Sequence, residues 1–298
     1  MTVLRTADDR FEGLPGYDFA PHFVQIDDTR LHTVDEGAGD ETVLCLHGEP
    51  TWSYLYRHII PPLASRYRVV APDMVGFGRS DKYAAEDDYS YRMHYDKLRG
   101  LIEALDLRNI TLVCQDWGGL LGLAIAANEG HRFARLVVLN TFLPTGEEKI
   151  SEAFLQWRAF SRKVGRRMQV GRLISQTIAS YQLPADIIAA YDAPFPDDSY
   201  KAGAAIFPSL VPISPEMPGA AEMRAAREKL ARWTKPVQVM FSDGDPILGG
   251  AATFFRRLFP TANEQPEITI RGAGHFLQEE KGAEIAAEVI AFIERTRS

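Results

Sequence analysis

One carboxylate stands in a sequence context that could make it a nucleophile. Asp116 lies between an apolar run and a helix-like segment, with Cys114 two residues before it and Gly118 two residues after it. Small residues at these two places permit a sharp, strained turn that projects the central side chain out of a sheet. A following helix favours the ionised carboxylate through its dipole. Because Asp is also a common helix N-cap, this segment alone leaves both roles open.

Two later segments could supply the partners that a nucleophile needs for hydrolysis. Asp243 and Asp245 follow an apolar run, and His275 lies in a small-residue loop after the next such run. The chain order nucleophile, acid, histidine is typical of α/β-hydrolases. We therefore predict His275 as the base and one of the two aspartates as its acid; a turn-forming role is the alternative for Asp243. Surface or packing roles are expected for His22, His32, His58, His94 and His131.

A third segment, Leu46–Trp52, follows the end of a strand and could complete an oxyanion hole. Hydrolases of this kind place a loop there whose backbone N–H points at the developing oxyanion. The sequence predicts the backbone N–H of Glu49 in this role, together with that of Trp117. His47 is expected to be a core histidine that bonds to the backbone.

Strands and helices must position these residues. Continuous apolar runs alternate with helical patterns, which indicates a parallel sheet covered on both faces. Strands are expected in residues 21–27, 30–37, 41–48, 67–78, 109–116, 135–141, 235–245 and 266–275, and helices in 91–107, 117–130 and 281–296. Residues 142–218 contain no convincing strand, and we expect helices there in 147–165, 169–181 and 185–193. The chain is thus predicted to be a core of 1–141 and 219–298 with an inserted helical cap of 142–218.

Composition narrows the class of protein. The 298 residues are 46% apolar and 24% charged, as in ordinary soluble globular proteins. The net charge of −7 argues against a nucleic-acid partner and against binding to an anionic membrane. Cys45 and Cys114 lie in apolar runs and are expected to be buried core residues rather than a disulfide. The beginning of the chain has no signal-peptide pattern and no run could span a membrane, so we predict a cytoplasmic protein.

Six segments together resemble those of the haloalkane dehalogenases. They are HGEPTWSYLYR, APDMVGFGRSDK, VCQDWGG, YDAPFPDDSYKAG, DPILG and GHFLQEE, and the resemblance extends over almost the whole chain. It is nearest to the branch with HGEPTW and a tryptophan pair, and the Asp-Trp pair at the turn is among its most specific parts. The resemblance implies the α/β-hydrolase fold, with a mostly parallel eight-stranded sheet flanked by helices and an inserted helical cap.

The resemblance assigns Asp116 as nucleophile, Asp245 as acid and His275 as base, and it favours Asp245 over Asp243. It implies that the carboxylate displaces a halide from a haloalkane and forms an alkyl ester. The histidine then activates a water molecule, which is the co-substrate, and hydrolysis yields a primary alcohol, a halide ion and a proton. No metal or organic cofactor is expected.

The same resemblance assigns the remaining site residues. The backbones of Glu49 and Trp117 would form the oxyanion hole. The indole N–H of Trp117 would donate one hydrogen bond to the halide, because Trp is a donor within an otherwise apolar side chain. Trp157, the only tryptophan of the insertion, would donate the second. Packing on an amphipathic helix is the alternative role of Trp157.

Three rival functions share parts of this pattern. An epoxide hydrolase would use the same Asp nucleophile with two cap tyrosines, for which Tyr181, Tyr191 and Tyr200 are available. A fluoroacetate dehalogenase would be expected to carry Arg where this chain has Trp117. A non-catalytic scaffold would often lack a triad member, whereas all three are present. For the substrate we expect brominated alkanes, since bromide leaves more easily than chloride, and for the assembly a monomer.

Overall fold

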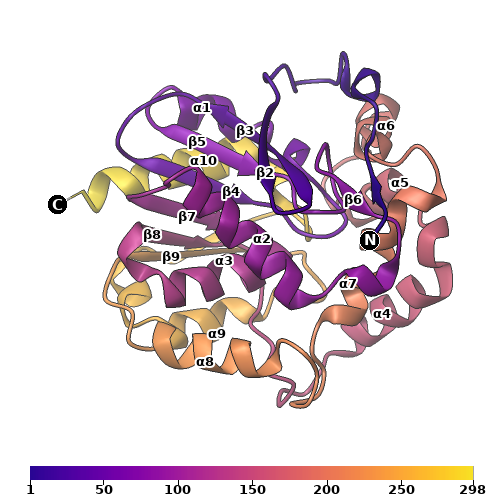
Figure 1. The fold of residues 1–298 in the computed structure, drawn as a ribbon. Helices are drawn as coiled ribbons and strands as arrows, with labels where there is room; N and C mark the ends of the chain where they lie inside the picture. The colour runs from indigo at the N-terminus through magenta and orange to yellow at the C-terminus, as the bar shows by residue number, and fades with distance from the viewer. Residues whose placement is uncertain (298) are drawn as a thin grey trace.

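Eight strands form one sheet in the computed structural model, which describes residues 1–297 (Figure 1). They are β2 (His22–Ile26), β3 (Thr29–Glu36), β4 (Thr42–Leu46), β5 (Arg68–Pro72), β7 (Ile110–Cys114), β8 (Phe133–Val138), β9 (Val237–Ser242) and β10 (Ile268–Ile270). Their order across the sheet is β10-β9-β8-β7-β4-β5-β3-β2. The strands from β10 to β5 pair in parallel, and β3 pairs antiparallel with both β5 and β2. This arrangement confirms the predicted, mostly parallel sheet of eight strands.

Helices cover both faces of this sheet and extend beyond one of its ends. They are α1 (Ile60–Ala64), α2 (Tyr91–Ala104), α3 (Trp117–Asn128), α4 (Glu152–Val164), α5 (Val170–Thr177), α6 (Ala185–Asp192), α7 (Ala202–Leu210), α8 (Ala220–Leu230), α9 (Ala251–Leu258) and α10 (Leu277–Arg295). α3 packs against α2 and α8, whereas α1 packs against α10. Two short strands, β1 (Val3–Leu4) and β6 (Lys82–Tyr83), form a separate antiparallel pair.

Four helices lie where the sequence predicted none, namely α1, α7, α8 and α9. α7 contains Pro208, which breaks the usual helical pattern, and most of its side chains are buried. The last helix also differs from its prediction. It begins at Leu277, four residues before the predicted start, with non-helical backbone angles at Lys281. The earlier turn joins α10 directly to the loop that holds His275.

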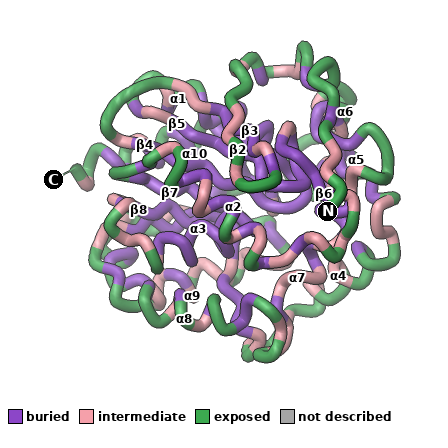
Figure 2. Tube along the Cα trace, viewed as in Figure 1, coloured by how far each residue is buried: buried purple, intermediate pink, exposed green. Residues whose placement is uncertain are grey.

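The four helices from α4 to α7 come from the insertion and lie together at one end of the sheet (Figure 1). Within this group, α5 packs against α6 and α4 packs against α7. The boundaries of the cap at 142 and 218 stay a prediction. Buried residues concentrate in the strands and the helices that cover them, whereas the outer parts of α4 to α6 are largely exposed (Figure 2).

The fold brings the predicted site residues to one edge of the sheet. The carboxyl ends of parallel strands meet at one edge, and the loops after β4, β7 and β9 carry Glu49, Asp116 and Asp245 there. The loop after β10 adds His275. Across residues 1–297, no helix combines the length and the apolar character needed to cross a bilayer.

Candidate active site

A strained turn between β7 and α3 presents Asp116. Its backbone has φ 49° and ψ −125°, a conformation that residues other than glycine rarely adopt. The turn is tight, because a Cβ atom at Gly118 would lie 2.2 Å from the carbonyl oxygen of Leu46. The backbone N–H of Asp116 donates to the carbonyl of Asn140 at 2.8 Å, which ties the turn to the end of β8. Strain of this kind is typical of functional sites, where the surrounding structure maintains it.

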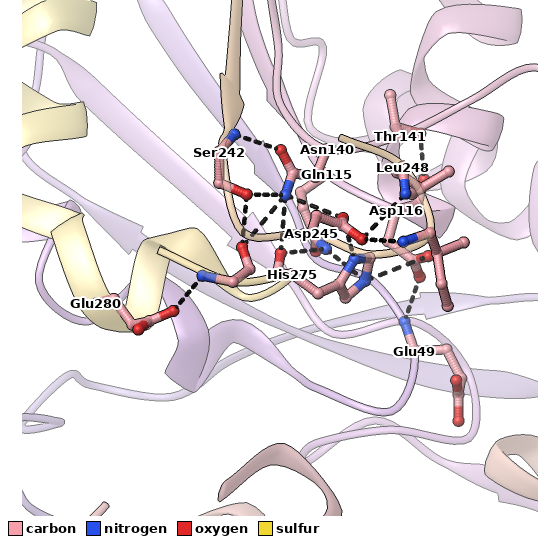
Figure 3. A network of polar contacts seen from close by, with 12 residues as sticks. Glu49, Gln115, Asp116, Asn140, Thr141, Ser242, Asp245, Leu248, His275 and Glu280 are labelled. Atoms are coloured by element: carbon pink, nitrogen blue, oxygen red, sulfur yellow. Dashed lines mark hydrogen bonds and ion pairs between the residues drawn. The ribbon is translucent and has the colours of Figure 1, made fainter. Parts of the chain in front are cut away.

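The side chain of Asp116 faces the oxyanion loop rather than its own helix. Asp116 occupies the N-cap position of α3, but within residues 1–297 its side chain makes no capping hydrogen bond to that helix. Its Oδ1 accepts the backbone N–H of Glu49 at 2.8 Å (Figure 3). Burial raises the pKa of Asp116, whereas the charge of His275 and the backbone N–H groups of Trp117 and Glu49 act in the opposite direction. The two predicted oxyanion donors therefore already stabilise the charged carboxylate.

His47 holds the peptide that carries the Glu49 donor. The backbone N–H of Met74 donates to His47 Nε2 at 3.0 Å, so Nδ1 carries the proton and donates to the Gly48 carbonyl at 3.0 Å. The hydroxyl of Thr51 donates to the same carbonyl at 2.7 Å. Because the Gly48 carbonyl and the Glu49 N–H belong to one planar peptide, these bonds also orient the N–H. The prediction of a core histidine bonded to the backbone is confirmed.

His275 lies between the two predicted carboxylates. Its Nδ1 is 2.7 Å from Asp245 Oδ2, and its Nε2 is 3.7 Å from Asp116 Oδ2. Burial disfavours the charged imidazolium, but the charge and hydrogen bond of Asp245 and the charge of Asp116 outweigh it and raise the pKa of His275 to about 8. A neutral His275 can therefore hold its proton on Nδ1, toward Asp245, and keep Nε2, the nitrogen nearer to Asp116, as an acceptor.

Asp245, and not Asp243, is the carboxylate that meets the histidine. Its second oxygen, Oδ1, accepts the backbone N–H groups of Ile247 and Leu248 at 2.8 and 3.0 Å. Burial raises the pKa of Asp245, but His275 and these N–H groups lower it further than burial raises it, so the net shift is downward. Asp243 instead accepts the backbone N–H of Gly272 at 2.8 Å and is exposed.

Asn140 is a site residue that the sequence reasoning missed. It lies two residues beyond the end of β8, and its Nδ2 donates to Ser242 Oγ at 2.7 Å and to Asp245 Oδ2 at 3.0 Å (Figure 3). Its Oδ1 accepts the backbone N–H of Ser242 at 2.9 Å. Asn140 thus holds both Asp245 and the end of β9, the strand that precedes it, in place. A polar residue next to the last position of a predicted, otherwise apolar strand was the available signal.

A cavity of about 710 Å³ opens over Asp116. Its lining includes all six predicted site residues, which are Glu49, Asp116, Trp117, Trp157, Asp245 and His275. Most of the remaining wall is apolar, with Leu120, Phe142, Phe154, Leu173 and Phe276 among its residues. Trp117 comes from the start of α3 and Trp157 from α4, so the core and the insertion each supply one indole. Such a cavity suits a small apolar substrate and keeps bulk water away from the carboxylate.

The tyrosines that an epoxide hydrolase would need face away from this cavity. Tyr191 and Tyr181 both donate to the buried carboxylate of Glu279, at 2.5 and 3.2 Å. Glu279 also pairs with Arg57, so these hydroxyls belong to a structural network between the insertion and the core. None of Tyr181, Tyr191 and Tyr200 is among the described residues that line the cavity. In residues 1–297, no three His, Cys, Asp or Glu side chains are grouped so as to hold a metal ion.

Known proteins resemble this chain over nearly its whole length. A model of the alpha/beta hydrolase fold family matches residues 41–282. A haloalkane dehalogenase from Psychrobacter cryohalolentis is 46% identical and covers 98% of either chain. Haloalkane dehalogenase 1 from Mycobacterium tuberculosis is 49% identical, over 99% of this chain and 100% of the other. Among solved structures, the tetrameric haloalkane dehalogenase DpaA from Paraglaciecola agarilytica has a TM-score of 0.91 and 39% identity, and covers 98% of both chains.

The fold and these similarities define the class of protein: the chain belongs to the α/β-hydrolase fold family. Within that family it belongs to the haloalkane dehalogenases, as relatives with close to half of their residues identical over the full length show. It is therefore a hydrolase that acts on carbon–halogen bonds.

Proposed function

We propose that this haloalkane dehalogenase works through a covalent ester on Asp116, with no cofactor. The observation that carries the proposal is the position of Asp116 in the lining of an apolar cavity, where it contacts two backbone donors and lies beside a histidine. An ionised carboxylate in a dry cavity is a good nucleophile toward a saturated carbon. Substrate enters as an uncharged haloalkane, and water is the second substrate.

In the first step, Asp116 attacks the carbon that carries the halogen, and the halide leaves with the bonding electrons. The attacking oxygen is best assigned to Oδ2, because Oδ1 is engaged by the Glu49 N–H. The negative charge passes from the carboxylate to the halide, so donors near the halide stabilise the transition state more than the ground state.

In the second step, His275 removes a proton from water, and the resulting hydroxide adds to the ester carbonyl of Asp116. The N–H groups of Glu49 and Trp117 stabilise the oxyanion that develops. Its collapse breaks the bond between the carbonyl carbon and the alkyl oxygen, and this oxygen leaves as the alcohol with the proton of the added hydroxyl, so that Asp116 is ionised again. His275 then releases to the solvent the proton that it took from water. Because the ester is uncharged, Asp116 no longer raises the pKa of His275 in the intermediate. The base is therefore more readily neutral in the step that uses it than in the resting enzyme.

We propose that the indole N–H groups of Trp117 and Trp157 bind the departing halide. Both side chains line the cavity, and each indole N–H is the one polar group of an otherwise apolar side chain. An indole donor that lines a cavity can bind an anion there. The two donors differ in origin, since Trp117 belongs to the core and Trp157 to the insertion.

Replacing Trp157 by Phe should weaken halide binding and slow the first step. A hydrogen bond to a charged group contributes enough to predict a loss of about 10–100-fold in kcat/KM for a chloroalkane. Bromide affinity, measured by quenching of tryptophan fluorescence, should fall in the same variant. Trp233→Phe is the matched control, because its indole N–H is buried outside the cavity and lacks a partner among the described residues. Equal bromide affinity in Trp157→Phe and wild type would exclude Trp157 as a halide donor.

The proposed activity is tested by halide release over a panel of short and medium chloro- and bromoalkanes. We expect stoichiometric alcohol and halide, with bromoalkanes turned over faster because bromide is the better leaving group. Matched epoxides of the same chain length should give no diol, since the cap tyrosines are bonded to Glu279 or lie outside the cavity lining. Diol formation without halide release would contradict the proposal.

The assembly in solution is a separate question. The monomer and the cytoplasmic location stay predictions from the sequence. The related protein DpaA from P. agarilytica is tetrameric. Light scattering of the purified chain measures its molar mass and distinguishes a monomer from a tetramer.

A further inference from the structure

Gln115, the residue before the nucleophile, contacts the nitrogen that must act as the base. Its side chain is fully buried, and its Nε2 lies 3.0 Å from His275 Nε2 and 3.3 Å from the His275 carbonyl oxygen (Figure 3). The carbonyl can only accept, so the amide NH₂ group, and not its oxygen, points toward His275. One side chain therefore touches both the ring and the backbone of the histidine.

The proton positions of this contact follow from the opposite side of the ring. Nδ1 of neutral His275 donates to Asp245 at 2.7 Å, which leaves Nε2 as an acceptor. The Gln115 NH₂ group then donates to the Nε2 lone pair. When His275 takes a proton from water, Nε2 becomes a donor as well, and two donors face each other at this contact. The bond exists only while the base is unprotonated.

We propose that Gln115 is a positioning residue that acts through His275: it stabilises the unprotonated form of the base and favours expulsion of the proton after hydrolysis. This inference rests on the proposed function of His275. The NH₂ group of Gln115 also donates to the His275 carbonyl, which holds the amide in place. The amide therefore cannot turn its oxygen toward the protonated ring to accept the new N–H.

The charged groups around His275 all act in the opposite direction. Asp245, from the loop after β9, and Asp116, from the turn after β7, both favour the imidazolium and raise the pKa of His275 to about 8. Glu280, on α10, accepts the backbone N–H of Gly274 and adds a carboxylate near the same loop. Glu49 lies beside Asp116, but burial raises its pKa well above the usual range and favours its neutral form. Gln115 is the neighbour that favours neutral imidazole.

The other end of the amide indicates that Gln115 is not retained for stability. Its Oε1 is buried and lacks a hydrogen-bond partner within residues 1–297. A buried polar atom without a partner destabilises the fold, and such atoms in native proteins call for an explanation. An apolar side chain of the same length would remove this cost. The contact with His275 supplies the reason to keep the amide.

The test compares two glutamine-to-methionine substitutions in the full-length enzyme. Gln115→Met removes the donor to Nε2, so the pKa of His275, followed by NMR titration of its ring, should rise by about half to one pH unit. The pH profile of ester hydrolysis, measured in single turnovers, should move to higher pH by the same amount. The melting temperature should stay the same or rise, because the unpartnered Oε1 is gone.

Gln238→Met is the matched control. Gln238 is also fully buried, but it lies at the opposite end of β9, and both halves of its amide are bonded, to Pro266 O at 2.9 Å and to Arg295. This variant should lose melting temperature and keep the wild-type pH profile. We thus expect Gln115→Met to shift the titration of His275 without loss of stability, and Gln238→Met to lose stability without a shift in titration.

A second variant covers the case in which Gln115→Met does not fold. Gln115→Asn keeps an amide but shortens it by one methylene, so its NH₂ group cannot reach Nε2, and the pKa of His275 should rise in the same way. An unchanged titration of His275 in the variant that folds would overturn the proposal. Because that titration needs no turnover, it is independent of the proposed function, which would instead fail if the wild-type enzyme released no halide.

Discussion

Replacing Asp116 by alanine should abolish halide release, by on the order of 10⁶-fold, the effect typical of removing a nucleophile that works with a base. Asp245, the other aspartate of the site, cannot take over the attack from the same place. Asp245 is bonded on both oxygens, by His275 on one side and by the Ile247 and Leu248 N–H groups on the other. Halide released from 1-bromobutane, followed by a colorimetric or conductivity assay, measures the loss.

The fold of Asp116→Ala should be intact and at least as stable as that of the wild type. The substitution removes a partly buried carboxylate whose pKa is raised by desolvation, and function is the usual reason to keep such a group. Asp27→Ala is a suitable control, because Asp27 has a similar positive φ of 51° but lies exposed in the turn between β2 and β3. Halide release by Asp116→Ala at the rate of Asp27→Ala would exclude Asp116 as nucleophile.

Replacing His275 by phenylalanine should separate the two steps. Alkylation of Asp116 needs no base, so the variant should release one halide per active site and then stop. Steady-state turnover should fall by on the order of 10⁴-fold, the upper range of general-base catalysis. Mass spectrometry of the intact protein should then show an added alkyl group, and peptide mapping should place it on Asp116.

The buried acid keeps enough partners for this variant to fold. Without the imidazole, Asp245 still accepts hydrogen bonds from Asn140, Ile247 and Leu248. His131→Phe, at an exposed position between α3 and β8, should turn over normally and accumulate no adduct. If His275→Phe carries no covalent adduct after exposure to a bromoalkane, the ester mechanism is wrong.

Much of the fold was predictable because it depends on local patterns. Buried parallel strands appear as continuous apolar runs, and the small residues around Asp116 predict the sharp turn. The helices α1, α7, α8 and α9 were missed. In α7, a proline at position 208 and a run of small residues hide the helical period, and the helix is stabilised by packing against α4 and the turns around it. Such packing leaves little trace in the local sequence.

The sequence by itself determined which residue types stand at the strand ends, and therefore the nucleophile, base and acid to be expected at one edge of a parallel sheet. It could not decide what those side chains contact, because their neighbours lie 30 to 160 residues away along the chain. Only the tertiary structure decided that Gln115 reaches His275 and that Asn140 holds Asp245. The tertiary structure also decided that Tyr181 and Tyr191 donate hydrogen bonds to Glu279 and that Trp157 lines the cavity. These contacts depend on how the insertion and the loops pack over the sheet, and that packing is a property of the whole chain.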